Sequence, residues 1–162
     1  MSEASAVPYV LDEGEGEVIR WFGATVTVKA SGPMFDVALT TEVAGSEPPL
    51  HVHADGDEAL FVLEGALTIF VDEEVLPASA GAFVFLPRGI PHTFAVDSGS
   101  ARLLVVLAPS GSLAMYADAE SRFGASGMPT RPRPADLALV SEDLARYGVS
   151  VRGPNPGLDP QR

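Results

Sequence analysis

The middle of this chain, from about residue 17 to residue 109, consists of short apolar runs separated by turn residues. Each run is rich in Val, Phe, Leu, Ile and Thr, and Gly, Pro or Asp stands close by. The runs read EVIRWF, TVTVKA, FDVALTTEV, PLHVH, EALFVL, ALTIFV, AFVFLP, HTFAV and ARLLVVLA. Many short strands at even spacing are typical of a β-sandwich or β-barrel. No run in this region has a helical period, so we predict an all-β domain.

We expect a single domain with flanking segments. A chain of 162 residues can bury a core without covalent crosslinks, and neither an internal repeat nor a second domain is visible. The expected parts are an N-terminal arm (1–16), a β-barrel domain (17–109), a C-terminal helical extension packed on the barrel (110–150) and a tail (151–162). The tail is rich in Gly and Pro, and we expect it to be poorly ordered.

Two short helices are predicted in the C-terminal extension. In GSLAMYADAESRFG, Ser112 is placed to cap the start of a helix and Gly124 to end it. Asp136 is the expected cap of the second helix, which ends at Gly148. The apolar side chains that recur on one face of this second helix are Leu137, Val140, Leu144 and Tyr147. We expect that face to pack on the outside of the β domain.

Composition excludes several classes of partner. The chain has 22 acidic and 10 basic residues, a net charge of −12 that repels nucleic acid and anionic lipid. No apolar run approaches the roughly 20 residues of a membrane helix, and the first residues do not read as a secretory signal. The chain has no cysteine, which excludes disulfides and thiolate metal sites and fits a reducing compartment. We expect a cytoplasmic protein whose partner is a small molecule, with no nucleic acid and no membrane.

All three histidines of the chain lie in one pattern with a glutamate. His51 and His53 alternate on one predicted strand, so their side chains share a face. Glu58 begins the next strand, and His92 comes from a distant one. A lone buried histidine is usually structural, but three imidazoles and a carboxylate are a ligand set for a first-row transition metal. We therefore predict a metal site formed by His51, His53, Glu58 and His92.

Two nearby acids compete with Glu58 as the carboxylate ligand. Asp55 and Asp57 flank the turn before Glu58. Asp is common in turns, and strand alternation directs Asp57 away from the face that Glu58 occupies. We expect both aspartates to face solvent.

The spacing around the predicted ligands resembles the cupin superfamily. Gly45, His51, His53, Glu58 and Gly65 match the first cupin motif, and Gly81, Pro87, Gly89 and His92 match the second. The stretches HVHADGDEALFVLEG and GAFVFLPRGIPHTF are most similar to small, single-domain, quercetinase-like (flavonol dioxygenase-like) bacterial cupins. With VTVKASG and ARYGVSVRGP, the resemblance spans about residues 9–154. It implies a double-stranded β-helix (jelly-roll) barrel with short C-terminal helices, and a homodimer.

The same resemblance implies a metal-dependent dioxygenase that acts on a small phenolic or enolic, flavonol-like compound. Each chain would bind one divalent transition metal, with Fe, Ni, Mn or Co favoured over Zn. Glu58 would be the catalytic residue and would accept the proton of the substrate hydroxyl before dioxygen attacks the activated carbon. A metal lowers the pKa of such a hydroxyl, so a nearby carboxylate can take the proton at neutral pH.

Strand alternation also predicts four residues that line a pocket. Leu60 and Val62 share the face of Glu58, and Phe94 and Val96 share the face of His92. These apolar side chains either line a substrate pocket beside the metal or fill the barrel core. The second cupin motif commonly has Asn where this chain has Val96, a change that makes the pocket more apolar.

Two other functions stay open. The metal can serve as a Lewis acid in a non-redox lyase, hydrolase or isomerase, or the chain can be a small-molecule-binding cupin without turnover. The identity of the metal separates the first two, since Fe, Mn, Ni or Co favours dioxygen chemistry and Zn alone favours Lewis-acid chemistry. A ligand that is retained without any product would indicate the third.

Overall fold

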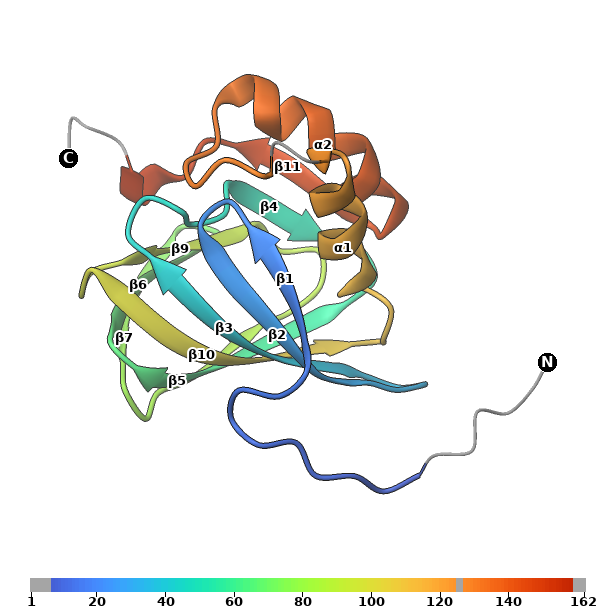
Figure 1. Ribbon diagram of the computed structural model, residues 1–162. Coiled ribbons are helices and arrows are strands. Elements are labelled where there is room, and N and C mark those ends of the chain that lie inside the picture. The colour runs from blue at the N-terminus through green and yellow to red at the C-terminus, as the bar shows by residue number, and fades with distance from the viewer. Residues whose placement is uncertain (1–6, 125–126, 159–162) are drawn as a thin grey trace.

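Two antiparallel β-sheets face each other, and two helices lie at one end of them (Figure 1). The computed structural model describes residues 7–124 and 127–158. In spatial order, the first sheet contains β1 (Glu17–Trp21), β2 (Ala24–Ser31), β3 (Asp36–Val43), β10 (Ser100–Ala108), β5 (Asp57–Glu64) and β8 (Phe83–Leu86). The second sheet contains β11 (Val149–Gly153), β4 (Leu50–His53), β9 (His92–Val96), β6 (Ala66–Val71) and β7 (Glu74–Ser79).

This arrangement confirms the predicted all-β jelly roll with short C-terminal helices. Every strand pairing among the described residues is antiparallel and joins strands of the same sheet. The two sheets therefore form an open jelly-roll sandwich rather than a closed barrel. Their inner faces follow the alternation of the sequence, because Leu60 and Val62 of β5 and Leu67 and Ile69 of β6 are all buried.

Two strands lie where the sequence predicted none. β7 contains Pro77, which cannot donate a backbone hydrogen bond, and β7 is accordingly an edge strand paired only with β6. β11 follows the predicted end of the second helix at Gly148, crosses the predicted boundary between the helical extension and the tail, and is the opposite edge of the same sheet. Its partner is β4, with Val149 beside His53 and Val151 beside His51. The C-terminal part of the chain thus supports the strand that carries two of the predicted ligands.

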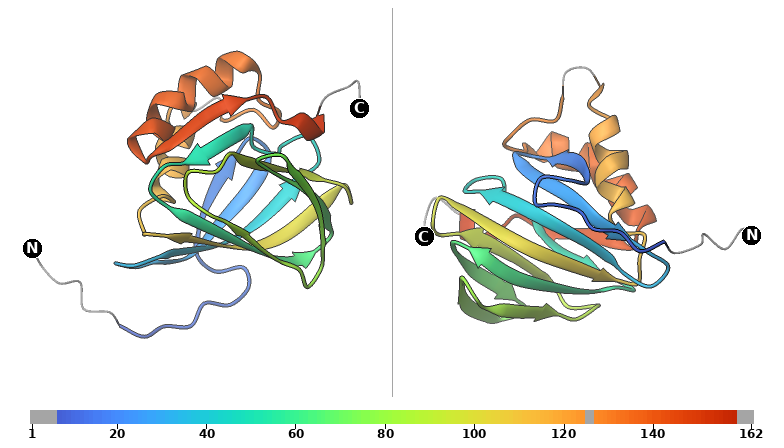
Figure 2. Two further views of the ribbon diagram at one scale, coloured as in Figure 1. Left: turned by 180° about the vertical axis from the view of Figure 1, so that it is seen from behind. Right: turned by 60° about the horizontal axis from the view of Figure 1, so that its bottom comes forward.

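The helices are α1 (Ala114–Ser121) and α2 (Pro134–Arg146). α1 packs against β1 and α2. α2 packs against β11, as the rear view in Figure 2 shows. Val140 and Leu144, from the predicted apolar face of α2, are buried. No helix in the described part of the chain has the length and apolar character needed to cross a lipid bilayer.

The helix starts differ from those predicted. Ser112 does not cap α1, so that prediction is wrong: the residue before the helix is Leu113, and it makes no side-chain capping bond. Buried Asp36 of β3 instead accepts hydrogen bonds from the backbone N–H groups of Gly111 (2.7 Å) and Leu113 (3.2 Å). Asp136 lies inside α2 rather than before it, and it accepts a hydrogen bond from the Arg133 backbone N–H (2.9 Å). Long-range and local acids therefore satisfy the free amides at the two helix starts.

The described part of the N-terminal arm, residues 7–16, contains no helix or strand. Lys29 of β2, the only lysine of the chain, holds it in place. The Lys29 ammonium donates hydrogen bonds to the carbonyl oxygens of Asp12 (2.7 Å), Glu13 (2.8 Å) and Glu15 (2.6 Å).

The segment after β11 closes against the histidine-bearing strands. The side chain of buried Asn155 donates hydrogen bonds to the carbonyl oxygens of Pro48 (2.9 Å) and Phe94 (2.8 Å), and to the Thr93 hydroxyl (3.1 Å). The Thr93 hydroxyl in turn donates to the Pro48 carbonyl (2.7 Å). A short 3-10 helix, η2 (Pro156–Leu158), follows. The sequence predicted a poorly ordered tail over residues 151–162, whereas in the described part, residues 151–158, these bonds join the entrance of β4 to β9. Residues 159–162 lie outside the described part of the chain.

Candidate metal centre

The four predicted ligands converge at one point between the sheets. His51 and His53 lie on β4, His92 begins β9, and Glu58 comes from β5 in the facing sheet. One ligand atom from each lies within 4.8 Å of the other three. The register pairs His51 directly with His92. Glu58 Oε2 lies 3.2 Å from His92 Nε2 and 3.4 Å from His53 Nε2.

A glycine turn places His92. The backbone N–H of Gly89 donates a hydrogen bond to the carbonyl oxygen of His53 (2.8 Å). Gly89 has a φ of +77°, a left-handed conformation that favours glycine over residues with a Cβ atom. This bond links the second motif to the strand of the first, three residues before His92.

Backbone carbonyls orient two of the imidazoles. His51 Nδ1 lies 2.9 Å from the Pro49 carbonyl oxygen, and His92 Nδ1 lies 2.9 Å from the Ile90 carbonyl oxygen. A carbonyl can only accept, so Nδ1 carries the ring proton in both residues. The Nε2 lone pairs are then available to a metal, an arrangement common among ligating histidines.

The charges of the cluster also suit metal binding. Burial lowers the pKa of His51 to about 4, and the neighbouring His92 adds to this effect. Burial likewise lowers the pKa of His53. Burial alone would raise the pKa of Glu58, but the hydrogen bond from His92 and the nearby imidazoles lower it to about 2. His92 is the exception among the rings: burial alone would lower its pKa, but the hydrogen bond and the charge of Glu58 raise it. In the metal-free protein a protonated His92 can therefore donate from Nε2 to Glu58, and metal binding displaces that proton.

The donor set fits one transition-metal ion. Bonds of about 2.0–2.2 Å from nitrogen and oxygen to such an ion place neighbouring ligand atoms roughly 3–4 Å apart. The spread of the four donors needs little adjustment to reach that geometry. Three imidazoles with a single carboxylate favour a first-row transition metal over Ca²⁺ or Mg²⁺, which prefer oxygen ligands.

The competing acids lie outside the cluster. Asp55 is exposed. Asp57 Oδ1 accepts hydrogen bonds from the Arg88 backbone N–H and Nε–H (both 3.0 Å), and its Oδ2 lies 2.7 Å from a terminal nitrogen of Arg88. Hydrogen bonds from Arg88 lower the pKa of Asp57 to about 2. Asp57 therefore fixes the Pro87–Gly89 turn from outside the cluster. Strand alternation had predicted that Asp57 points away from the face that Glu58 occupies.

A small cavity adjoins the cluster. Its volume is about 60 Å³. That space holds roughly four to six water molecules, or about 120–180 Å³ of liquid water. Most of its wall is apolar, and its lining includes His51, Glu58 and His92. Of the four residues predicted to line a pocket, Leu60 and Phe94 border the cavity, whereas Val62 and Val96 are buried in the surrounding core.

The cavity wall has a polar part that was not predicted from the sequence. Thr40 and Glu42 of β3 line it, together with Trp21 of β1 and Tyr116 of α1. Alternation within FDVALTTEV contained the signal for the first two, because Thr40 and Glu42 share a face of one strand. No comparable signal exists for Tyr116, which reaches the cavity only because α1 packs against β1.

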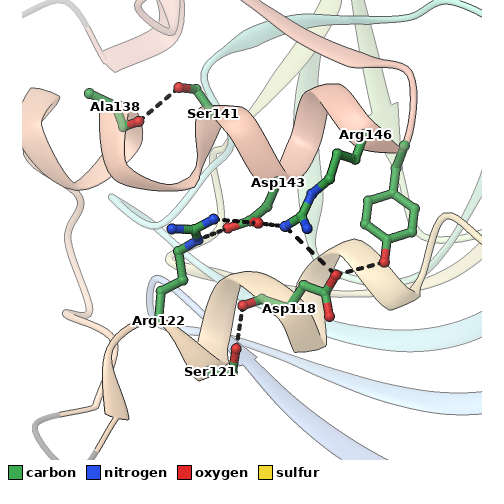
Figure 3. A network of polar contacts seen from close by, with 8 residues as sticks. Asp118, Ser121, Arg122, Ala138, Ser141, Asp143 and Arg146 are labelled. Atoms are coloured by element: carbon green, nitrogen blue, oxygen red, sulfur yellow. Dashed lines mark hydrogen bonds and ion pairs between the residues drawn. The ribbon is translucent and has the colours of Figure 1, made fainter.

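The helices that border the cavity are joined by a network of charges, which we call the helix latch: Asp118 and Arg122 near the end of α1, with Asp143 and Arg146 of α2 (Figure 3). Asp143 is almost fully buried and pairs with both arginines. The Tyr147 hydroxyl donates a hydrogen bond to Asp118 (2.8 Å). Met115 and Tyr116 of α1 and Leu144 of α2 line the cavity, so the helix latch holds one of its walls.

We predict that Asp143→Asn loosens both helices without unfolding the sheets. The variant loses both ion pairs, and the expected loss in the free energy of unfolding is about 1–3 kcal/mol, because the arginine side chains are 36% and 59% exposed and water screens them. Amide hydrogen exchange should quicken in α1 and α2 and stay unchanged in β3 and β10. Ser141→Ala is the control, since the Ser141 hydroxyl bonds only to a carbonyl of its own helix. Unchanged exchange in Asp143→Asn would contradict a holding role for the helix latch.

Comparison with known proteins agrees with this geometry. Residues 39–107, which include all four ligand candidates, match the family model of the cupin domain. The chain therefore contains a cupin domain. Over 102 residues, or 60% of its length, this cupin is 34% identical to quercetin 2,3-dioxygenase of Bacillus subtilis (strain 168). The alignment covers only 30% of that longer enzyme.

Solved structures agree on the fold. This cupin aligns with KdgF from Halomonas sp. with a TM-score of 0.61 and 14% identity, over 67% of this chain and 99% of the other. TT1209 from Thermus thermophilus aligns with a TM-score of 0.51 and 29% identity, over 56% of this chain and 89% of the other. The aligned parts are shorter than this chain.

Proposed function

We propose that this cupin is a metal-dependent dioxygenase of a small enolic or phenolic compound. The observation that carries the proposal is the convergence of Glu58 with three imidazoles on the wall of a mostly apolar cavity. Such a site offers four donors for an ion, a proton acceptor and a mostly apolar binding space side by side. The similarity to a bacterial quercetin 2,3-dioxygenase supports the choice of dioxygen chemistry.

The cavity volume limits the size of the substrate. Pockets that bury drug-sized ligands measure about 300–1,000 Å³, far more than the roughly 60 Å³ here. A cavity that binds benzene measures about 150 Å³, so a compound with one six-membered ring needs a small outward movement of the wall formed by α1 and α2. A three-ring flavonol would need a much larger movement. We therefore place the substrate among one-ring enols and phenols.

The position of each residue in the site determines its proposed role. The bound ion lowers the pKa of an enolic hydroxyl and activates the substrate toward dioxygen. His51 and His92 direct their Nε2 atoms inward because backbone carbonyls hold Nδ1. Glu58 stays charged at neutral pH and accepts the hydroxyl proton at its carboxylate. Leu60 and Phe94 exclude water from the reacting groups.

The test combines metal analysis with oxygen consumption. Protein purified without a metal-affinity tag should contain near-stoichiometric Fe, Ni, Mn or Co and should consume oxygen with a one-ring enol such as a hydroxypyranone or a catechol. Exclusive zinc without oxygen uptake would instead support Lewis-acid chemistry. A site that refuses added metal would overturn both enzyme functions and leave a binding cupin.

Glu58→Gln tests the proton acceptor. We expect this variant to retain more metal than a histidine deletion, because the three imidazoles remain. Its oxygen consumption should fall by at least about 100-fold, a typical contribution of a positioned acid or base. Rates are compared per bound metal ion, so that loss of metal and loss of the proton acceptor are separated. A fully active Glu58→Gln protein would exclude the assigned role.

A further inference from the structure

The cavity contains a second carboxyl group that metal binding does not explain. On β3 the side chains of Asp36, Ala38, Thr40 and Glu42 alternate into the interior, and all are buried. Glu42 is 7% exposed and lines the same cavity as Glu58. The two acids enter the cavity at different positions along β10. In the strand register, Glu42 lies opposite Ala101 and Glu58 lies opposite Leu107. One cavity therefore has an acid at the metal cluster and another away from it.

Glu42 differs from the other buried glutamate nearby. Glu47 accepts hydrogen bonds from the backbone N–H groups of Gly45 (2.6 Å) and Val96 (2.9 Å), so its place in the fold is explained. No cation in the described part of the chain pairs with Glu42. Thr40 is the one side chain near enough to favour its charged form, and the Thr40 hydroxyl has no hydrogen bond of normal geometry among the described residues. Buried polar groups normally have partners.

The surroundings of Glu42 disfavour negative charge. Burial, together with the charges of Glu47 and Glu58, raises the pKa of Glu42 to about 7 and outweighs the opposing effect of Thr40. Tyr116 lies within reach of the same charges, since burial, Glu58 and Glu42 all raise the pKa of Tyr116. This end of the cavity thus offers neutral or weakly acidic hydrogen-bonding groups and no cation. It suits an uncharged hydroxyl, whereas a carboxylate or phosphate there would meet like charge.

We propose that Glu42 is a specificity-determining residue that hydrogen-bonds to a neutral hydroxyl group of the substrate, at the end of the cavity away from the histidine–glutamate cluster. The proposal rests on the proposed function and narrows it. The substrate is then a one-ring compound with an enolic oxygen at one end and an uncharged hydroxyl at the other. The bond adds a partner to a buried carboxyl that has the Thr40 hydroxyl beside it.

Three hydroxypyranones that differ at a single substituent test this inference. Allomaltol, kojic acid and comenic acid share one chelating 5-hydroxy-4-pyranone ring and carry methyl, hydroxymethyl and carboxylate at position 2. Their affinities for the Ni²⁺-loaded protein are measured by calorimetry at pH 7 without oxygen, so that nothing turns over. Kojic acid should bind about tenfold more tightly than allomaltol, the expected gain from one hydrogen bond. Comenic acid should bind at least about tenfold more weakly than allomaltol.

Two variants separate a role in recognition from a role in folding. In Glu42→Leu, the preference for kojic acid over allomaltol should shrink to about twofold or less, while allomaltol binds at least as tightly as to the wild type and bound Ni²⁺ stays at the wild-type level. In Glu42→Gln, which keeps the shape and a hydrogen-bonding amide, the preference for kojic acid should persist. The penalty on comenic acid should shrink but remain, because burial, Glu47 and Glu58 still disfavour negative charge there. General damage to the cavity would weaken all three ligands together.

Different results would contradict the role of Glu42 and the proposed metal-dependent function. Equal affinities of the three compounds for the wild-type protein, or an unchanged preference in Glu42→Leu, would overturn the role of Glu42 and leave the metal site intact. Failure of all three to bind the Ni²⁺-loaded wild-type protein, or failure to load Ni²⁺, would overturn the proposed function and this inference with it.

Discussion

His92→Ala should remove most of the bound metal. His92 is buried, its Nδ1 is held by the Ile90 carbonyl, and its Nε2 faces the other three donors. Loss of this donor leaves three ligands and an apolar gap that water fills poorly, so we expect metal affinity to fall on the order of 100-fold or more. Metal content per chain after dialysis, followed by competition with a chelator, measures the change. His51→Ala should behave alike, since its ring is fixed in the same way by Pro49.

Asp57→Ala is the matched control for this experiment. Asp57 lies one residue before Glu58 but pairs with Arg88 outside the cluster. Its removal should leave the metal content at the wild-type level. Full retention of metal by His92→Ala, or loss of metal from Asp57→Ala alone, would show that the ligand set is misassigned.

Glu42→Gln should stabilise the metal-free protein at alkaline pH. The pKa of Glu42 is about 7 in the folded protein, against 4.5 for an ordinary glutamate. Because the folded state holds this proton more tightly, the stability linked to Glu42 is fully present below about pH 4.5 and is lost as the pH rises through about 7. A neutral Gln avoids the loss. The variant should match the wild type near pH 4.5 and exceed it by about 3 kcal/mol at pH 8.

Chemical denaturation at several pH values between 4.5 and 8.5 measures this difference. Glu73→Gln removes an acid from an exposed turn and serves as the control, with an expected change below about 0.5 kcal/mol at every pH. A constant difference between Glu42→Gln and wild type across the range would mean that Glu42 is already ionised in the folded protein at low pH.

The convergence of the four candidate ligands could be predicted because it depends on local rules. His51 and His53 share a strand face by period two, and the same parity separates Glu58 from Asp57. Short apolar runs with turn residues between them likewise predicted the all-β fold. These features need only a few neighbouring residues, and each appears in the sequence as a spacing.

The cavity wall could be predicted only in part, because it depends on contacts between distant segments. Leu60 and Val62 have the same parity, yet only Leu60 borders the cavity. The difference arises from how far each residue lies along β5 from the cluster. Tyr116 enters the cavity wall through the packing of α1 on β1. The group that caps α1 could not be predicted from neighbouring residues for the same reason. Asp36 of β3, far away in the sequence, accepts the hydrogen bonds of the backbone N–H groups there.

The hydrogen bonds of Asn155 limit how far the chain can be shortened at its C-terminal side. Asn155 lies well outside the residues that match the cupin domain, yet it joins the Pro48 carbonyl to β9 beside the ligands His51 and His92. A fragment trimmed to the matched segment would keep all four metal donors and lose the side chain that fixes two of their strands. Minimal versions of this protein, and fusions to its C-terminal side, therefore need to retain the chain through η2.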